Sequence, residues 1–404
     1  MNNQQKEKMK EFNLTTKRRC FFIKGITALS LSFALQGKRC TSGGGTMDHM
    51  VKKINDNAFM REIENRNDIS QEDEVHNNLL YAAVSSNNLQ KVVLLLNRID
   101  KDIKSGFRYK EKDFPNIYNK KSKKTALGLA IEENYIPIVR RLAQSEHIDI
   151  NKAKIGSTSL LEALFHKKKE IAKILLDHPK IDICTKDAIS GSSPLHLAIE
   201  QKLEDTALLL IPKLSYQDFK EKNKKGEIPL HLAIEHNLKE VITVLVRGLS
   251  SIEDLCQKDN KGRSPLHMAV RDNNQTAFKL LLDKIWILCH NKNPFVDSNQ
   301  LFAQLFDKDI KGRSVFARSY LPKYTTQGWV HITDNNVNMF EYVLKTVGEV
   351  AHLNGSQWEA IIEEINKFAH QGTIKEQYAD RLRKIVDTYR GAKNAVGAGS
   401  VASV

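Results

Sequence analysis

Apolar residues recur through the central part of the chain with the spacing of a single buried helical face. A leucine, an alanine and an aliphatic residue stand at positions i, i+3 and i+4, as at Leu195, Ala198 and Ile199, and this spacing is typical of an amphipathic α-helix. Each such segment is followed by a second amphipathic stretch, for example LQKVVLLL, IPIVRRLA, KEIAKILL or LKEVITVLV. The pattern therefore predicts pairs of short helices and an all-α fold.

These helix pairs are copies of one another. The segments SSPLHLAIEQ (192–201), EIPLHLAIEH (227–236) and RSPLHMAVRD (263–272) place their central alanines 35 and 36 residues apart. The same register is found upstream at Ala83, Ala130 and Ala163, and a degenerate copy begins near residue 312. Self-similarity at such a period is the signature of stacked repeats, so residues 75–350 are predicted to form one array of about six to seven copies.

The repeated motif resembles the ankyrin-repeat family, whose repeat of about 33 residues carries a T-P-L-H-x-A signature. The resemblance implies an all-α repeat solenoid with short hairpin fingers between repeats and a C-terminal helical cap. Physical chemistry agrees, because Pro194, Pro229 and Pro265 suit the first position of a helix. Hydroxyl side chains before that position, at Thr125, Ser193 and Ser264, are expected to be N-caps. A glycine two residues before each cap (Gly156, Gly191, Gly226, Gly262, Gly312) is expected to adopt a positive φ.

The repeated histidines His196, His231 and His267 are interpreted as structural. In the family that this chain resembles, this imidazole bonds groups within and between neighbouring repeats. A zinc site would need several ligands converging on one point, whereas these residues occur once per repeat. We therefore expect no metal and no cofactor. Cys184, Cys256 and Cys289 are expected to be small buried side chains without a chemical role.

The resemblance also implies a partner-binding surface made of finger tips and the first helices. Carried over by position, the finger residues are Lys186, Asp187, Lys222, Asn223, Lys224, Lys258, Asp259, Asn260, Lys308 and Asp309. The helix residues are Glu132, Glu133, His166, Glu200, Gln201, Glu235, His236, Arg271 and Asp272. This mixed polarity suits a protein partner better than a polyanion, because nucleic-acid-binding faces are more uniformly positive. Solubility alone is an equally simple account of any single one of these side chains.

Two insertions interrupt the array, at residues 99–121 and 285–308, and insertions of this kind usually form loops. The second contains Trp286, Phe295, Phe302 and Phe306. This aromatic surface either packs back on the array as a helix, which we favour, or contacts a partner, with Trp286 as the first candidate for a binding hot spot.

The first fifty residues have the pattern of an export signal. Lys17, Arg18, Arg19 and Lys24 precede the apolar segment GITALSLSFALQG, and Cys40 follows, before TSGGGT. A basic region followed by 7–15 apolar residues is typical of a secretory signal. Together with the cysteine it resembles a bacterial lipoprotein signal, which implies acylation of Cys40 and membrane attachment, although Gly37 and Arg39 depart from that pattern. Residues 1–50 are therefore interpreted as a leader and flexible tether, and the protein as exported to the cell envelope or secreted. An uncleaved interfacial anchor, or a disordered leader on a cytoplasmic protein, is the alternative.

The C-terminal region predicts two more helices, 356–370 and 373–389, with capping boxes Ser356/Glu359 and Thr373/Glu376. A polar helical pair at residues 351–390 suits the terminal cap that repeat arrays need; a recruiting module is the alternative. Residues 391–404 are rich in small side chains and are expected to be disordered.

The chain carries no HExxH, G-x-S-x-G, Walker A or G-x-G-x-x-G motif. Outside the array, leader and tail there is little room for a catalytic domain, so the protein is predicted not to be an enzyme. The net charge of +14 comes mostly from residues 1–50 and 100–124, not from a folded face, which disfavours specific nucleic-acid binding. The function predicted is a monomeric protein-interaction scaffold, with a host protein as one possible partner. The alternatives are an effector whose C-terminal helices recruit an enzyme complex and, least favoured, a nucleic-acid-associated protein.

Overall fold

The computed structural model describes residues 61, 79–109, 113–292, 299–321, 334–350, 353–371 and 374–399. The chain divides into Met1–Asn67 and Asp68–Val404, and the elements described below belong to the second unit. The predicted leader, including Cys40, lies outside the described residues. Within the described ranges, no helix is both long enough and apolar enough to cross a bilayer.

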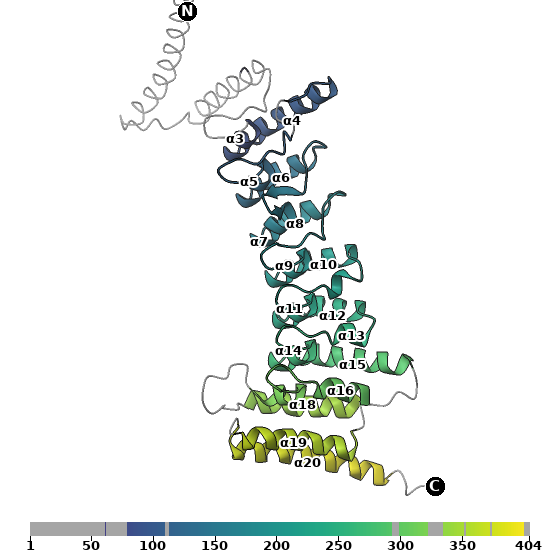
Figure 1. Ribbon diagram of the computed structural model, residues 1–404. Helices are drawn as coiled ribbons and strands as arrows, with labels where there is room; N and C mark the ends of the chain where they lie inside the picture. The colour runs from purple at the N-terminus through teal and green to yellow at the C-terminus, as the bar shows by residue number, and fades with distance from the viewer. Residues whose placement is uncertain are drawn as a thin grey trace, which may run out of the picture. The chain divides into compact units, whose positions relative to one another are not determined.

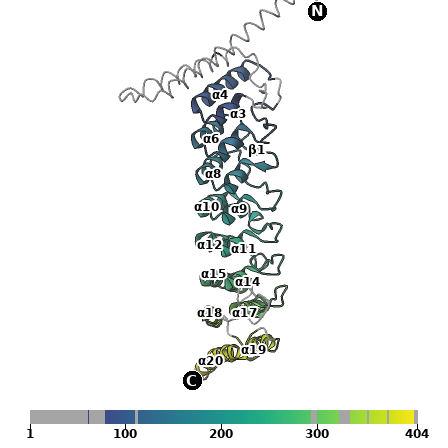
Figure 2. The same cartoon turned by 90° about the vertical axis from the view of Figure 1, so that its left-hand side faces the viewer.

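Seven helix pairs follow one another in the second unit. They are α3 (Leu79–Ser85) with α4 (Leu89–Lys104), α5 (Ala126–Glu132) with α6 (Ile136–Ala143), α7 (Ser159–Phe165) with α8 (Lys169–Leu176), α9 (Pro194–Glu200) with α10 (Glu204–Leu210), α11 (Pro229–Glu235) with α12 (Lys239–Gly248), α14 (Pro265–Arg271) with α15 (Gln275–Lys292), and α17 (Val315–Tyr320) with α18 (Asp334–Val350). The first helices contact one another in chain order and form one row, and the second helices form the other (Figures 1 and 2). This arrangement is the predicted all-α repeat solenoid.

Short elements lie in the connections between the pairs. They are β1 (Lys152–Lys154) and β2 (Ser157–Thr158), which pair antiparallel, the 3₁₀ turns η1 (Ile211–Lys213) and η2 (Asp218–Lys220), and the helices α13 (Ile252–Leu255) and α16 (Asn299–Phe306). We call the turn that precedes each first helix a finger.

Local sequence sets where the first helices begin. The side chains of Thr125 and Ser193 accept hydrogen bonds from the backbone N–H groups of Gly128 and His196, so the predicted N-caps of α5 and α9 are confirmed. All five predicted finger glycines have φ between +67° and +82°, a region that side chains with a Cβ rarely adopt. The motif residues Leu195, Ala198 and Ile199 are buried, as are their equivalents in the other repeats. The core is therefore continuous along the array.

The insertions are less loop-like than expected. Residues 99–104 belong to α4, a helix of 16 residues whose buried apolar face continues to Ile99. In the second insertion, α15 reaches Lys292 and α16 covers residues 299–306. Ile285 and Leu305 are buried, and the Phe306 ring lies 5.2 Å from that of Phe316. These helices are packed against the array, as we favoured, while Phe295 lies outside the described residues.

The C-terminal helices α19 (Gly355–His370) and α20 (Glu376–Gly399) follow the last pair. The capping box of α19 is Asn354/Gln357 and not Ser356/Glu359, because the Ser356 hydroxyl donates to Asn354 Oδ1. The amide side chain of Asn354 thus reaches the free N–H of the first turn and starts the helix earlier. Thr373 lies outside the described residues. Helix α20 continues to Gly399, whereas the sequence analysis expects a disordered tail from residue 391; its alanines there favour a helix.

Helix α19 covers the end of the array. The Ser314 backbone N–H and hydroxyl both donate to the carboxylate of Glu364, and the Phe368 ring lies 6.4 Å from that of Tyr320. Burial raises the pKa of the Glu364 carboxyl. Through these contacts α19 packs against α17 and its N-cap, while its role as the terminal cap stays a prediction.

Candidate partner-binding surface

The three motif histidines lie between successive repeats. Nε2 of His196, His231 and His267 is 3.0, 2.9 and 3.0 Å from the backbone carbonyl oxygens of Glu227, Arg263 and Asp307, each in the next repeat. In α9 and α14, Nδ1 meets the hydroxyl of the N-cap serine at 2.8 Å. Burial lowers the pKa of all three imidazoles to about 4, so they are neutral at pH 7. Each of them joins its own repeat to the next one.

The finger carboxylates and amides hold their own turns. The Asp259 Oδ1 atom accepts from the backbone N–H groups of Lys261 and Arg263, both at 2.8 Å. Asn223 accepts from its own turn in the same way, at 2.9 and 3.0 Å. Asp187 accepts from the backbone N–H of Ser190 at 2.6 Å. These residues, predicted as partner contacts, therefore have their acceptors occupied within the fingers, which their polarity alone did not reveal.

The predicted finger lysines join neighbouring fingers. Lys186 Nζ is 3.1 Å from Glu221 Oε1, Lys222 Nζ donates to the Lys258 carbonyl at 2.7 Å, and Lys258 Nζ donates to Asp307 Oδ1 at 2.6 Å. Asn260 makes the same kind of contact, since its Nδ2 donates to the Lys224 carbonyl at 2.9 Å. Their partners lie one repeat away, so these side chains join neighbouring fingers. Their role as contacts for a partner protein stays a prediction.

A different set of lysines lines a cleft of about 500 Å³ between the last fingers and the first helices. Lys225, Lys261 and Lys311 each stand directly before a finger glycine and are exposed. Sequence reasoning missed them, although the repeated Lys-Gly pairs of fingers 225–226, 261–262 and 311–312 were a signal that could have found them.

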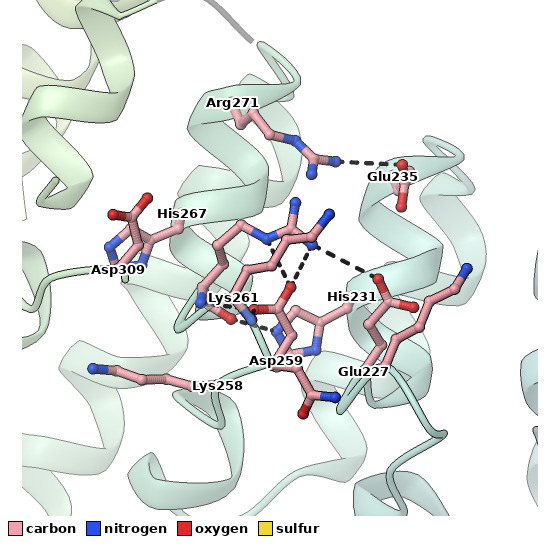
Figure 3. Close-up of polar contacts among 12 residues, drawn as sticks. Glu227, His231, Glu235, Lys258, Asp259, Lys261, His267, Arg271 and Asp309 are labelled. Atoms are coloured by element: carbon pink, nitrogen blue, oxygen red, sulfur yellow. Dashed lines mark hydrogen bonds and ion pairs between the residues drawn. The ribbon is translucent and has the colours of Figure 1, made fainter. Parts of the chain in front are cut away.

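Buried ion pairs form the floor of this cleft (Figure 3). Arg263 Nε donates to Asp259 Oδ2 at 2.7 Å, and its guanidinium lies 3.7 Å from Glu227. Asp309 accepts from both Arg313 and Arg318. Burial opposes the charge of Asp309, but the backbone N–H of Arg313 and the two guanidinium charges lower the pKa of its carboxyl. The floor is thus a set of fixed charges that largely neutralise one another.

The predicted residues of the first-helix row are only partly brought together. Arg271 lies 3.6 Å from Glu235 across two helices (Figure 3) and also pairs with Asp272. Glu200, Gln201 and His236 are half-buried nearby in the same row. Burial lowers the pKa of His236. Trp286 is half-buried on α15, in the other row of helices, so it does not join the finger residues.

A pocket of about 380 Å³, called the apolar pocket below although charged side chains also line it, lies nearer the N-terminal end of the same row, around the fingers before α7 and α9. Three of its lining residues are large apolar side chains that are well exposed: Ile155 (56%), Phe165 (64%) and Ile189 (86%). Leu161 and Leu197 also line it. No part of the sequence analysis singled out these residues, because exposure at a finger tip depends on the neighbouring repeat.

Two of the three predicted cysteines, Cys184 and Cys256, lie where the structure describes the exposure of side chains. Among the described residues, no group of three or more His, Cys, Asp or Glu side chains could hold a metal ion. Cys184 is exposed and Cys256 half-buried, so the expectation of buried thiols is wrong for Cys184. It follows Asp182, which turns the chain outward by accepting the Cys184 backbone N–H at 2.8 Å.

Comparison with known proteins gives a family match. The family model for ankyrin repeats, described as three copies, matches residues 80–187 and 195–293. No curated protein matches the chain. Similar solved structures include the ankyrin repeat domain of Bcl-3, a member of the IkappaB protein family (20% identity, 66% of this chain and 99% of that one, TM-score 0.46). Others are a predatory endopeptidase from Bdellovibrio bacteriovorus in complex with an immunity protein (20%, 53% and 100%, 0.40) and the ankyrin repeat domain of human ASB11 (15%, 65% and 98%, 0.42).

Proposed function

Because this chain belongs to the ankyrin-repeat family, we propose that it is a non-enzymatic scaffold that binds a partner protein along its fingers and first helices. The observation that carries the proposal is the apolar pocket. Ile189 is 86% exposed and Phe165 64% exposed, and both line one cavity. Singly exposed apolar residues are ordinary, but a group of them around one pocket is typical of an interaction site.

The scaffold suits binding with little ordering of its own side chains. Phe165 ends α7, and Ile155 and Ile189 stand on fingers that are held by hydrogen bonds within the turn and to the next repeat. A preformed site avoids part of the entropic cost of association. An aromatic or aliphatic side chain of the partner entering this pocket would be buried among at least five apolar residues, which is how binding hot spots are usually built.

The proposal is tested by selecting phage-displayed random peptides on the full chain. The affinities of the selected peptides are then measured for the double variant Phe165→Ser/Ile189→Ser. Loss of a hot spot predicts binding weaker by about thirtyfold, since such residues contribute about 2 kcal/mol or more. The matched control is Ile287→Ser, which removes an apolar side chain that is 50% exposed on α15, in the other row. If the double variant binds the peptides as tightly as the wild type does, the proposed surface is wrong.

We further propose that the array acts outside the cytoplasm, on a host or envelope protein. The basic residues 17–24, the apolar segment after them and Cys40 support this proposal. Peptide mass spectrometry of the native N-terminus, in membrane and soluble fractions, tests it. An acylated Cys40 or a cut near residues 34–37 is expected; an intact N-terminus in the soluble fraction would overturn export.

A further inference from the structure

Three lysines of the cleft differ from the finger lysines Lys186, Lys222, Lys224 and Lys258, whose ammonium groups all have partners. Among the described residues, the ammonium groups of Lys225, Lys261 and Lys311 have no ion pair and no hydrogen bond, whereas Lys222 and Lys258, in two of the same fingers, are both engaged. The three occupy one position of the repeat, directly before the finger glycine. They therefore form a row of positive charges that the array itself does not use.

The residues around this row of lysines determine which kind of ligand the cleft can bind. The lining includes Ile310, which is 70% exposed, and the carboxylates of Glu227 and Glu235, together with seven basic residues: Lys225, Lys261, Lys311, Arg263, Arg271, Arg313 and Arg318. The arginines are already paired with Asp259, Asp309, Glu227, Glu235 or Asp272. The basic residues of this lining without an ion-pair partner among the described residues are therefore the three lysines.

One buried donor in the lining also lacks an acceptor. Arg318 is 5% exposed, and its guanidinium binds Asp309, but its Nε atom has no hydrogen-bond partner among the described residues. Buried donors are nearly always satisfied. The cleft thus has an unsatisfied buried donor in its wall and unpaired cations at its rim, and the exposed cations are the groups that acceptor oxygens of a partner can reach.

We propose that this lysine cleft, defined by Lys225, Lys261 and Lys311, binds an acidic segment of the partner protein, with its carboxylates on the lysines and an apolar side chain against Ile310. The inference rests on the proposed function and names the chemistry of the partner. Positive and negative surfaces that complement each other steer association and select the correct partner.

A protein segment fits this cleft better than a nucleic acid. Faces that bind nucleic acids are much more positively charged than those that bind proteins, whereas Glu227 and Glu235 stand in this lining beside the exposed Ile310. A polyphosphate backbone would meet those two carboxylates and would leave the apolar side chain without a partner. A peptide can alternate acidic and apolar residues to match both.

The test uses the same random-peptide library on the full chain and on the variant Lys225→Glu/Lys261→Glu/Lys311→Glu. Peptides selected on the wild type are expected to be enriched in Asp and Glu together with an apolar residue, and the variant should lose that enrichment. The matched control is Lys239→Glu/Lys279→Glu/Lys345→Glu, which changes the same number of exposed charges on α12, α15 and α18 of the same three repeats. The control should select the same acidic peptides as the wild type.

Affinity and salt dependence give a second measurement on a milder variant. Synthetic copies of the selected peptides should bind the variant Lys225→Gln/Lys261→Gln/Lys311→Gln about tenfold more weakly than the wild type at low salt. Added salt should lower the affinity of this variant less than it lowers that of the wild type. Circular dichroism and thermal unfolding of each variant show that the fold is intact.

The outcomes separate this inference from the proposed function. Peptides that need Phe165 and Ile189 but show no acidic enrichment would overturn the lysine cleft and leave the scaffold in place. Peptides insensitive to both sets of substitutions would overturn both. A duplex DNA oligonucleotide that binds more tightly than the peptides, and loses binding in the Lys→Glu variant, would show a nucleic-acid site instead.

Discussion

Two regions of the array close the gap between successive repeats in different ways. In α9, α11 and α14, the third residue after the N-cap is a histidine, and its imidazole reaches a carbonyl oxygen of the next repeat. In α5 the same position is Gly128, and a Cβ there would overlap the carbonyl group of Ala153 in β1. The Thr125 backbone N–H donates to that same carbonyl oxygen at 2.8 Å.

The comparison shows that the contact between one first helix and the next finger can be made by a side chain or by the backbone itself. Around α5, the finger that contains β1 moves in against the helix because glycine leaves room. In the central repeats a buried imidazole lies between the first helix and a carbonyl oxygen of the next repeat. The two regions should therefore respond differently to added volume and to pH, and four predictions test this difference and the joining of the fingers that accompanies it.

The largest effect is expected for Gly128→Ala. An alanine in an open helix position stabilises by up to about 1 kcal/mol relative to glycine, but here the added methyl meets backbone atoms of Ala153 that cannot rotate away. Overpacking of this kind typically costs 1–3 kcal/mol, so we expect the free energy of unfolding in urea to fall by about 3 kcal/mol. Gly355→Ala, at the start of α19 with no atom within 4 Å of the new Cβ, is the control and should be neutral or stabilising.

The central repeats should instead show a pH dependence that comes from their histidines. Burial lowers the pKa of His231 to about 4, from the ordinary value of 6.5 for histidine. Protons therefore bind the unfolded chain first, and the stability contributed by the neutral imidazole is complete above pH 6.5 and is lost as the pH falls toward 4. Between pH 7 and pH 5 this loss is about 2 kcal/mol for each such histidine.

The variant His231→Gln isolates that contribution. It is expected to be less stable than the wild type at pH 7, but its free energy of unfolding should fall by about 2 kcal/mol less between pH 7 and pH 5. The comparison between variants matters because Glu364, whose pKa is raised by burial, acts in the opposite direction in both proteins. His370→Gln, which replaces an exposed imidazole on α19, is the control for the substitution itself. Equal pH dependence in His231→Gln and wild type would show that this imidazole is not held neutral.

Much of the fold followed from the sequence because the signals are local. Pro194, Ser193 and Gly191 fix a helix start through their own backbone preferences, whatever lies nearby. The surface did not follow, because its chemistry depends on the neighbouring repeat. The sequence shows that Lys186 is charged, but not that Glu221, 35 residues further on, neutralises it. The exposure of Phe165 likewise depends on where the adjacent fingers lie.

A smaller difference in stability is expected when the same glycine is replaced by alanine in an internal finger and in the last one. Gly226 and Gly312 have φ of +74° and +68°, so alanine at either position costs about 1 kcal/mol in backbone strain. A Cβ at Gly226 would also lie 2.7 Å from the backbone nitrogen of Asn260 in the next finger, whereas at Gly312 it would meet nothing within 4 Å. Gly226→Ala should therefore destabilise by about 1 kcal/mol more than Gly312→Ala. Equal unfolding midpoints for the two variants would mean that the contact of the new Cβ with Asn260 in the next finger has no cost.

The smallest effect on stability, and the one most informative for function, distinguishes two lysines of a single finger. Lys258 pairs with Asp307 at 2.6 Å across partly exposed side chains, and such pairs contribute about 0.2–1 kcal/mol. Lys258→Ala should lower the free energy of unfolding by that amount and leave the binding of acidic peptides unchanged. Lys261→Ala should leave the free energy of unfolding unchanged and weaken the binding of acidic peptides, since the lysine-cleft proposal requires its free ammonium group for binding. If both variants lost binding equally, the finger would bind as a whole, and the division between lysines that join fingers and lysines that face a partner would be wrong.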